Sequence, residues 1–133
     1  MKLITRDIDY AVRALCLMSE NKTERIFSVA ELVAELETPQ PFLRKILQQL
    51  NKKGFLKSYK GNGGGFRLAL APDKIYLSDL VQAFQGPLQL NQCLFKKKIC
   101  PGINSCTFRK KIGNIEQHVV SQLKAISIKS LLT

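Results

Sequence analysis

Residues 28–54 read SVAELVAELETPQPFLRKILQQLNKKG, and this stretch decides the fold. It opens with Ser28, followed three residues later by Glu31, which is the pairing of a capping box at the start of a helix. Apolar residues then recur at helical spacing on both sides of a short break that contains Pro39. Gly54 ends the second periodic stretch as a C-terminal cap. Two helices joined by a tight turn predict a helix-turn-helix.

The second helix of this pair is predicted to run from the break at residues 37–40 to about Lys53. Thr38 is able to cap this helix, and Pro39 is pre-set for its first turn. Its predicted buried stripe consists of Phe42 or Leu43, followed by Ile46, Leu47 and Leu50. Its opposite face is basic, as expected for a helix that lies in a DNA groove.

Periodic segments also flank the helix-turn-helix. Residues 7–18 carry apolar side chains at steps of three and four, which predicts an amphipathic helix. Residues 55–60 and 66–70 alternate around the glycine-rich turn 61–65, which predicts a β-hairpin. A hairpin directly after the second helix of a helix-turn-helix is a wing.

Two further helices are predicted in the second half of the chain. Ser78 caps a short one that Gly86 ends, and another starts near Thr107. One face of the latter carries Ile112, Ile115, Val119, Leu123 and Ile126, and Ser127 is placed to cap a last turn. This apolar face is either a dimer seam or a surface that packs on the winged domain of the same subunit.

The predicted fold is therefore mainly α with a small β-hairpin wing. We expect a winged helix-turn-helix DNA-binding domain over residues 1–86 and a cysteine-bearing loop over residues 87–106. A dimerisation helix and C-terminal turn are expected over residues 107–133. A length of 133 residues suits one domain with such an appended element.

Composition indicates the class of partner. A formal net charge of +11 and a sequence pI near 9.8 favour a polyanion, nucleic acid before an anionic membrane surface. No apolar run is long enough to span a membrane, and charged residues from Arg6 to Arg13 exclude a signal peptide, so we expect a cytoplasmic protein. A single histidine and no nucleophile–base pair argue against an enzyme.

The predicted DNA contacts lie on the outer face of the second helix and on the wing. Arginine suits guanine, glutamine suits adenine, and lysine reaches a phosphate or guanine. The helix positions are Thr38, Gln40, Phe42, Arg44 and Lys45, and the wing positions are Lys60, Asn62 and Arg67. The plainer interpretation of these positions is a solvated basic face.

Three cysteines are clustered in the segment without helical period. Cys93, Cys100 and Cys106 offer three thiolates, and the expected reducing compartment disfavours disulfides. Iron–sulfur clusters prefer cysteine ligands, whereas structural zinc sites use closer cysteine pairs that are absent here. An iron–sulfur cluster is the first interpretation, with thiol–disulfide chemistry and zinc as alternatives.

Several segments together resemble a known family. They are residues 1–3 and 10–12, Pro41-Phe42-Leu43 with the later LNKKG at 50–54, and the wing sequence KGNGGGF at 60–66. The chain resembles the bacterial winged-helix iron–sulfur repressors that include IscR and NsrR. This resemblance implies a homodimer that binds a partly palindromic operator, with the three cysteines as ligands of a two-iron or four-iron cluster.

The resemblance leaves the fourth ligand open. IscR-like relatives place a histidine three residues after the last cysteine, where this chain has Arg109, and the only histidine is His118. NsrR-like relatives use an aspartate of the other subunit, and the matching residue here is Asp9. Asp9 is equally well explained as an acid favoured by the helix dipole. Cys16, on the same predicted helix, is expected to pack in the core.

The working hypothesis is a homodimeric DNA-binding transcriptional regulator, a repressor, whose operator affinity is switched by an iron–sulfur cluster. One alternative is a winged-helix transcriptional regulator that senses its signal by thiol–disulfide chemistry and holds no cluster. An alternative of another class is a basic iron–sulfur electron-transfer or carrier protein. Nitric oxide, oxygen and iron status remain open as signals, as do the target genes and the state that binds DNA.

Overall fold

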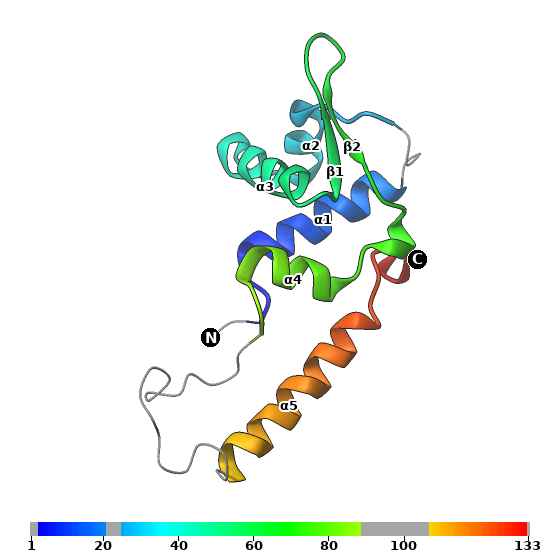
Figure 1. Cartoon of the computed structure of the whole chain (residues 1–133). Helices are drawn as coiled ribbons and strands as arrows, with labels where there is room; N and C mark the ends of the chain where they lie inside the picture. The colour runs from blue at the N-terminus through cyan, green and yellow to red at the C-terminus, as the bar shows by residue number, and fades with distance from the viewer. Residues whose placement is uncertain (1–2, 21–24, 89–106, 133) are drawn as a thin grey trace.

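The computed structural model describes residues 3–20, 25–88 and 107–132 (Figure 1). The helices are α1 (Arg6–Glu20), α2 (Val29–Leu36), α3 (Gln40–Lys52), α4 (Leu77–Gln85) and α5 (Thr107–Lys124), with short 3-10 turns η1 (Pro72–Lys74) and η2 (Lys129–Leu131). An antiparallel hairpin of β1 (Leu56–Tyr59) and β2 (Gly65–Leu68) forms the wing. The predicted fold class, mainly α with a hairpin wing, is confirmed.

The helix-turn-helix begins as its capping box predicts. The Ser28 hydroxyl accepts the Glu31 N–H at 3.1 Å, and the Ser28 N–H donates to the Glu31 carboxylate at 3.3 Å. The turn to α3 uses a left-handed residue, Glu37, at φ 50°. The N-cap of α3 is Pro39, without a side-chain hydrogen bond, so the prediction that Thr38 caps this helix is wrong.

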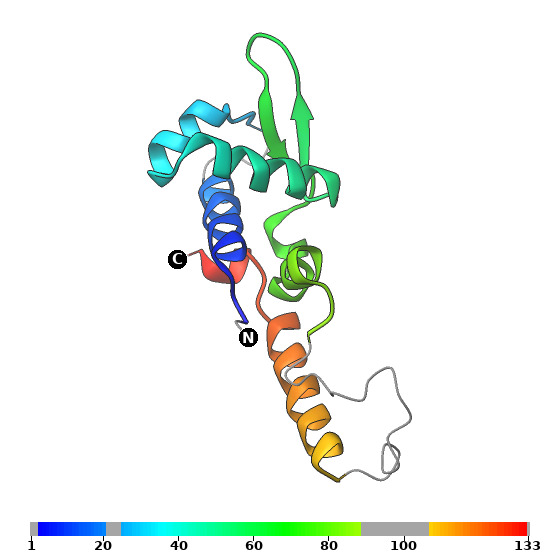
Figure 2. The same cartoon turned by 90° about the vertical axis from the view of Figure 1, so that its left-hand side faces the viewer.

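The core lies between α1, α2, α3 and the base of the wing (Figure 2). Leu43, rather than Phe42, starts the buried stripe of α3, and it is fully buried. The remaining stripe residues, Ile46, Leu47 and Leu50, are buried as predicted. They meet Leu15 and Met18 of α1, because helical periodicity places one face of each helix toward the same interior.

The wing is joined to the segment before α2 by a bridge that periodicity does not reveal. Phe27 pairs with Phe66 of β2 in an antiparallel β-bridge. Both side chains are buried, at 3% and 8% exposed. The wing is therefore attached to the helix-turn-helix through backbone hydrogen bonds as well as through its base.

The start of α4 differs from the prediction. The helix begins at Leu77 with Tyr76 as N-cap, so the prediction that Ser78 caps it is wrong. The acid three residues after the N-cap, Asp79, accepts the Tyr76 N–H at 3.2 Å and stabilises this end. Gly86 ends α4 at φ 80°, as predicted.

The C-terminal tail returns to the winged domain. The Ile128 N–H donates to the Ile75 carbonyl at 2.8 Å, and the Ile128 side chain is 1% exposed in the main core. The N-cap of η2 is Ile128, so the prediction that Ser127 occupies the cap position is wrong, although the Ser127 hydroxyl does accept the Ser130 N–H at 3.1 Å. The division at residues 86 and 106 stays a prediction, although these last residues complete the core of the first part.

Between α4 and this tail, α5 extends away from the winged domain (Figures 1 and 2). Only its C-terminal part packs on the domain, through Leu123 and Val119 against Ile8 and Val81. Nearer its start, Phe108 is 66% exposed and Ile115 is 51% exposed. The predicted apolar face thus packs partly on its own subunit and is partly uncovered.

Candidate nucleic-acid interface

The outer face of α3 is basic and accessible. Gln40, Arg44 and Lys45 are exposed, on the side opposite the buried stripe. Gln48, which is not among the predicted contact residues, is exposed one turn after Arg44 and lies on the same face. The sequence feature that indicates Gln48 as a contact residue is its helical spacing, because Gln40, Arg44 and Gln48 follow one another at steps of four residues. This face combines groups that suit adenine, guanine and phosphate.

The wing projects beyond α3 as a narrow hairpin (Figure 1). Lys60 and Asn62 are exposed at its tip. Arg67, on the returning strand, lies opposite Lys57 in the register, and its guanidinium is 5.6 Å from the centroid of the Tyr59 ring. A ring under the guanidinium holds the cation at the surface of the hairpin.

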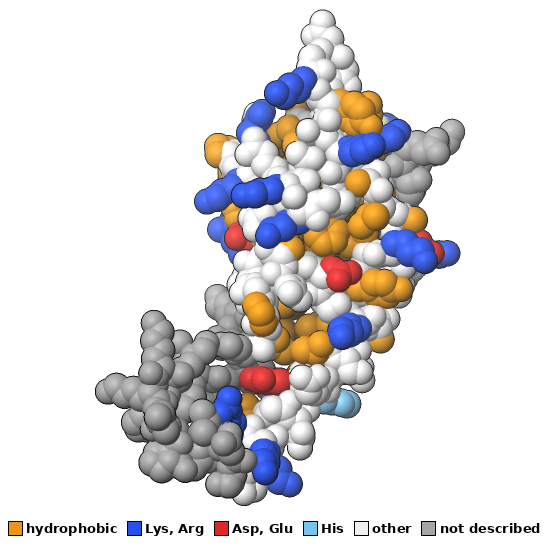
Figure 3. All heavy atoms as spheres, in the orientation of Figure 1, with side chains coloured by type: hydrophobic (Ala, Val, Ile, Leu, Met, Phe, Trp, Pro, Cys, Tyr) orange, Lys and Arg blue, Asp and Glu red, His pale blue; other side chains and the backbone are white. Residues whose placement is uncertain are grey.

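Lysine and arginine side chains gather on the part of the molecule formed by α3 and the wing, whereas few acids are visible there (Figure 3). A concentration of positive charge on one face is the electrostatic footprint of a nucleic-acid-binding surface. The predicted positions that are exposed on α3 and at the wing tip therefore belong to a basic part of the surface.

Two of the predicted DNA-contact residues, Thr38 and Phe42, are not exposed on the outer face of α3. Thr38 is 5% exposed, so the expectation that its side chain points outward is wrong; the left-handed turn at Glu37 precedes it and the chain buries it. Among the described residues, its hydroxyl has no hydrogen-bond partner. Phe42 is half-buried and contacts the Tyr10 ring edge-to-face, with centroids 5.5 Å apart. Phe42 therefore packs the start of α3 against α1.

Cations of α1 surround this aromatic pair. The Arg6 guanidinium lies 4.7 Å from the Phe42 centroid, and that of Arg13 lies 5.6 Å from the Tyr10 centroid. Both arginines are exposed. These two arginines are not among the predicted contact residues, although their spacing of four and three residues from Tyr10 is a usable signal. They add positive charge beside the first turn of α3.

Asp9, the predicted fourth ligand, lies in the first turn of α1. Its side chain is 48% exposed, and its Oδ1 accepts a hydrogen bond from the Arg13 Nε at 3.0 Å. This contact raises the pKa of Arg13, mainly through the hydrogen bond itself. The carboxylate is therefore at the surface, held by a side chain of its own helix.

The three predicted thiolate ligands, Cys93, Cys100 and Cys106, lie outside the described residues. Among the residues that are described, no three His, Cys, Asp or Glu side chains are grouped so as to hold a metal ion. Cys16 packs against the core as expected, and burial raises the pKa of its thiol. Arg109 and His118 are both exposed on α5.

A helix-turn-helix with a hairpin wing and one basic face defines a winged-helix DNA-binding regulator. The chain belongs to the Rrf2 family, because residues 4–133 match the sequence profile of that family, described as an iron-dependent transcriptional regulator. This confirms the resemblance to the family of IscR and NsrR. In the parts of the chain that the structure describes, no helix is long and apolar enough to cross a membrane.

Relatives with assigned names are also transcriptional regulators. The chain is 32% identical over 127 residues to a provisionally named HTH-type transcriptional regulator of Aquifex aeolicus, covering 94% of this chain and 88% of the relative. It is 25% identical to an rrf2-like regulator of Rhodobacter capsulatus, covering 98% and 92%. The chain is accordingly a transcriptional regulator and not an enzyme, and the electron-transfer alternative is set aside.

Solved structures share the fold. The global cysteine regulator CymR of B. subtilis is 21% identical, with a TM-score of 0.75 over 98% of this chain and 96% of that one. A regulator from Listeria innocua is 19% identical, with a TM-score of 0.80 over 98% and 85%. IscR of T. potens is 21% identical, with a TM-score of 0.67 over the same shares. At these identities the likeness concerns the fold alone.

Proposed function

We propose that this chain is a homodimeric repressor of the cytoplasm whose operator affinity is set by an iron–sulfur cluster. The ligands would be Cys93, Cys100 and Cys106 of one subunit and Asp9 of the partner subunit. The observation that carries this proposal is the set of three cysteines within residues 93–106 of a chain that belongs to an iron-dependent regulator family. The operator would be read by α3 and the wing.

The donor set suits such a cluster. Thiolates are its preferred ligands, and three of them require one further donor. Asp9 is suitable for this role because its carboxylate is half-exposed on α1 and is not enclosed in the core. A ligand from a second subunit must be reachable from outside its own subunit, and Asp9 meets that condition. When bound, the cluster supplies iron that reacts with oxygen or nitric oxide.

The proposed dimer is supported by the uncovered part of α5. Phe108 and Ile115 place large apolar side chains in water in the single chain, at a cost of roughly 25 cal/mol for each Å² left uncovered. A second α5 packed against this face would remove that cost. It would also bring two winged domains together, as two operator half-sites require.

The path from the cysteine segment to α3 runs through α4. The segment follows α4 in the chain and precedes α5, so a change in its shape would act on both helices. The carbonyl of Ala83 on α4 accepts a hydrogen bond from the Gln49 side chain of α3 at 3.3 Å. A shift of α4 therefore acts on the C-terminal end of the helix proposed to read DNA. Different operator affinities in two such states are all that a switch requires.

The deciding experiment is purification of the full chain without oxygen, followed by visible absorption and by iron and sulfide analysis. A brown protein with iron and sulfide supports the cluster. Colourless protein without either, whose operator affinity responds to thiol oxidants, would instead favour thiol–disulfide sensing. Operator binding measured in both states then identifies the form that binds.

The fourth ligand is tested by substitution. Asp9→Ala is expected to lose or alter the visible spectrum after anaerobic reconstitution, whereas His118→Ala is expected to leave it unchanged. The fold should tolerate Asp9→Ala, because an exposed pair such as Asp9–Arg13 contributes only about 0.2–1 kcal/mol. A stable cluster of unchanged spectrum in the Asp9 variant would exclude this residue as a ligand.

A further inference from the structure

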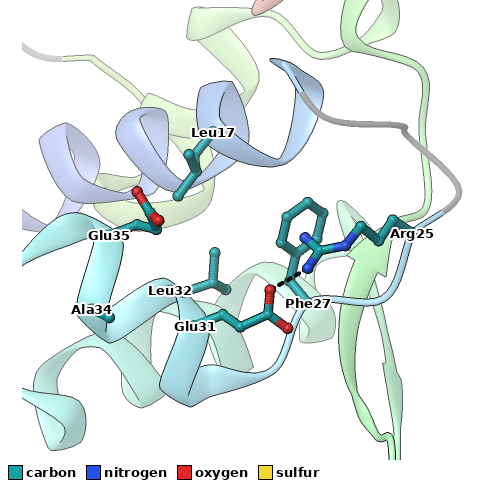
Figure 4. A pocket seen from close by; sticks show the side chains of 7 residues that line it. All are labelled: Leu17, Arg25, Phe27, Glu31, Leu32, Ala34 and Glu35. Atoms are coloured by element: carbon teal, nitrogen blue, oxygen red, sulfur yellow. Dashed lines mark hydrogen bonds and ion pairs between the residues drawn. The ribbon is translucent and has the colours of Figure 1, made fainter.

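A cavity of about 480 Å³ lies between α1, α2 and the segment that leads into α2 (Figure 4). Its accessible apolar residues are Leu17 and Ala34, and the buried side chains of Phe27 and Leu32 lie beneath them. Among the described residues, its charged groups are Arg25, Glu31 and Glu35. The cavity is separate from the outer face of α3 and from Asp9, so neither the proposed DNA contacts nor the proposed cluster uses it.

Its charged groups are arranged at two ends. Arg25 pairs with the Glu31 carboxylate, and its guanidinium lies 4.3 Å from the centroid of the Phe27 ring. This pairing lowers the pKa of Glu31. Glu35 lies one helical turn after Glu31, at the end of the cavity beside Leu17 (Figure 4). A positive group thus stands at one end and a second carboxylate at the other.

These charges favour a ligand with both an ammonium and a carboxylate. Carboxylates one turn apart on a helix repel each other, and within the part of the chain that the structure describes Arg25 balances only one of the two. A ligand ammonium near Glu35 would balance the second. A guanidinium has five donors, so Arg25 can receive a ligand carboxylate beside Glu31. A carboxylic acid alone would add a third negative charge, and an amine alone would leave those donors unused.

We propose that this cavity binds an apolar α-amino acid as an effector. Its side chain would lie on Leu17 and Ala34, above the buried Leu32 and Phe27, while its two charged groups meet Arg25 and Glu35. The cavity opens to solvent, so a ligand can enter without rearrangement of the core.

The walls of the cavity belong to the DNA-reading unit. Phe27 is bridged to Phe66 of the wing, and the second carboxylate oxygen of Glu31 accepts the N–H of the α2 N-cap, Ser28. A ligand that contacts Arg25, Phe27 and Glu31 therefore acts on the wing and on α2 together. If it binds the DNA-bound and free forms differently, operator and ligand change each other's affinity by the same factor. This effector role rests on the proposed DNA-binding function.

The site is tested by calorimetric titration of the full chain with L-leucine, without DNA. We expect saturable binding with one molecule per chain. Glu35→Gln and Arg25→Gln should each weaken it by at least about tenfold, as the loss of a charge-assisted hydrogen bond predicts. Glu37→Gln is the matched control, because it makes the same change at the C-cap of α2, outside the cavity lining, and should leave binding unchanged.

Two fragments of leucine test the ligand class. Isoamylamine lacks the carboxylate and isocaproate lacks the ammonium, and each should bind at least about tenfold more weakly than leucine. No measurable leucine binding, or isoamylamine binding as tightly as leucine, would overturn the proposal. Glu35→Gln keeps the size of the side chain at an exposed position, so it remains informative even if Arg25→Gln destabilises α2.

The effector role has a separate readout. Saturating leucine should change the operator affinity of the wild-type chain and leave that of Glu35→Gln unchanged. An operator affinity identical with and without leucine would overturn this role. A chain that binds leucine and no operator fragment at low salt would instead contradict the proposed function, so the two failures are distinguishable.

Discussion

Phe27 and Phe66 exchange two backbone hydrogen bonds, because the Phe27 N–H donates to the Phe66 carbonyl at 2.7 Å and the Phe66 N–H donates back at 2.8 Å. This exchange fixes the wing relative to the segment that enters α2. It also brings the two backbones very close at Gly65, where a Cβ would lie 2.1 Å from the Phe27 carbonyl oxygen. A side chain at position 65 would therefore force the two backbones apart.

Gly65→Ala is expected to destabilise the chain and to weaken operator binding. The methyl group would collide with backbone, and the φ of 153° is one that side chains rarely adopt. The cost should be about 1–3 kcal/mol, measured by urea unfolding. Gly113→Ala is the control, since nothing lies within 4 Å of its Cβ position on α5, and it should be neutral or stabilising. Equal stability of the two variants would show that the wing tolerates a displaced strand.

Arg44→Ala and Lys60→Ala should weaken operator binding in different ways. Arg44 lies on the outer face of α3, so its loss should cost about 1–3 kcal/mol and relax base preference at one position. Lys60 lies at the wing tip, so its loss should weaken binding to all sequences and lower the salt slope by about one.

The measurement for this pair is binding to operator variants over a salt series. Lys74→Ala serves as the charge control, because this exposed lysine lies in η1, outside the predicted interface. Equal and sequence-independent losses for Arg44→Ala and Lys60→Ala would mean that α3 does not read bases.

The helices and the hairpin could be predicted because their signals are local. The spacing of Leu43, Ile46 and Leu50 indicates which face of α3 is buried, and the opposite face follows from the same period. The capping box of Ser28 and Glu31 is likewise contained in one helical turn.

The features that could not be predicted depend on partners distant in sequence. Nothing near Phe27 or Ile128 indicates that the first pairs with the wing or that the second enters the core. Thr38 suits a cap by residue type, but tertiary packing buries it. At the candidate site, the basic residues of α3 followed from helix phase. The packing of Arg6 on Phe42 required the contact between α1 and α3.

Glu31→Gln should change how stability depends on pH. Arg25, more than the Ser28 N–H, lowers the pKa of Glu31, so the ionised carboxylate stabilises the fold. That contribution is full above the ordinary glutamate pKa of about 4.3 and is lost as pH falls through the lower folded value. Since the pair is exposed, the difference between wild type and variant should be about 0.5–1 kcal/mol near neutral pH and should shrink in acid.

The comparison for this prediction is Ser28→Ala, which removes the cap hydroxyl without removing a titrating group. Its cost of about 1 kcal/mol should depend less on pH than that of Glu31→Gln, because the hydroxyl accepts the Glu31 N–H, and its own hydrogen bond to the Glu31 carboxylate is the smallest cause of that group's lowered pKa. Unfolding by urea at a series of pH values measures both variants. A constant difference between wild type and Glu31→Gln across that series would show that the ion pair contributes nothing to stability.

Ile115→Glu should separate the subunits while leaving the winged domain folded. Ile115 is 51% exposed on α5, so a charge there disturbs a partner helix more than its own subunit. Leu123→Ala should destabilise the fold of the subunit and leave the contact between subunits intact. Leu123 is 7% exposed and packs with Ile8 and Val81, so its truncation should cost about 2–4 kcal/mol of stability.

Sedimentation equilibrium and urea unfolding distinguish these two effects. Gln117→Glu adds the same charge as Ile115→Glu. Because Gln117 lies two residues further along the helix, its side chain is on the opposite face, and the substitution should leave the dimer intact. Loss of the dimer should also weaken operator binding, because one winged domain contacts only one half-site. A dimer of unchanged affinity in Ile115→Glu would place the subunit contact away from the uncovered face of α5.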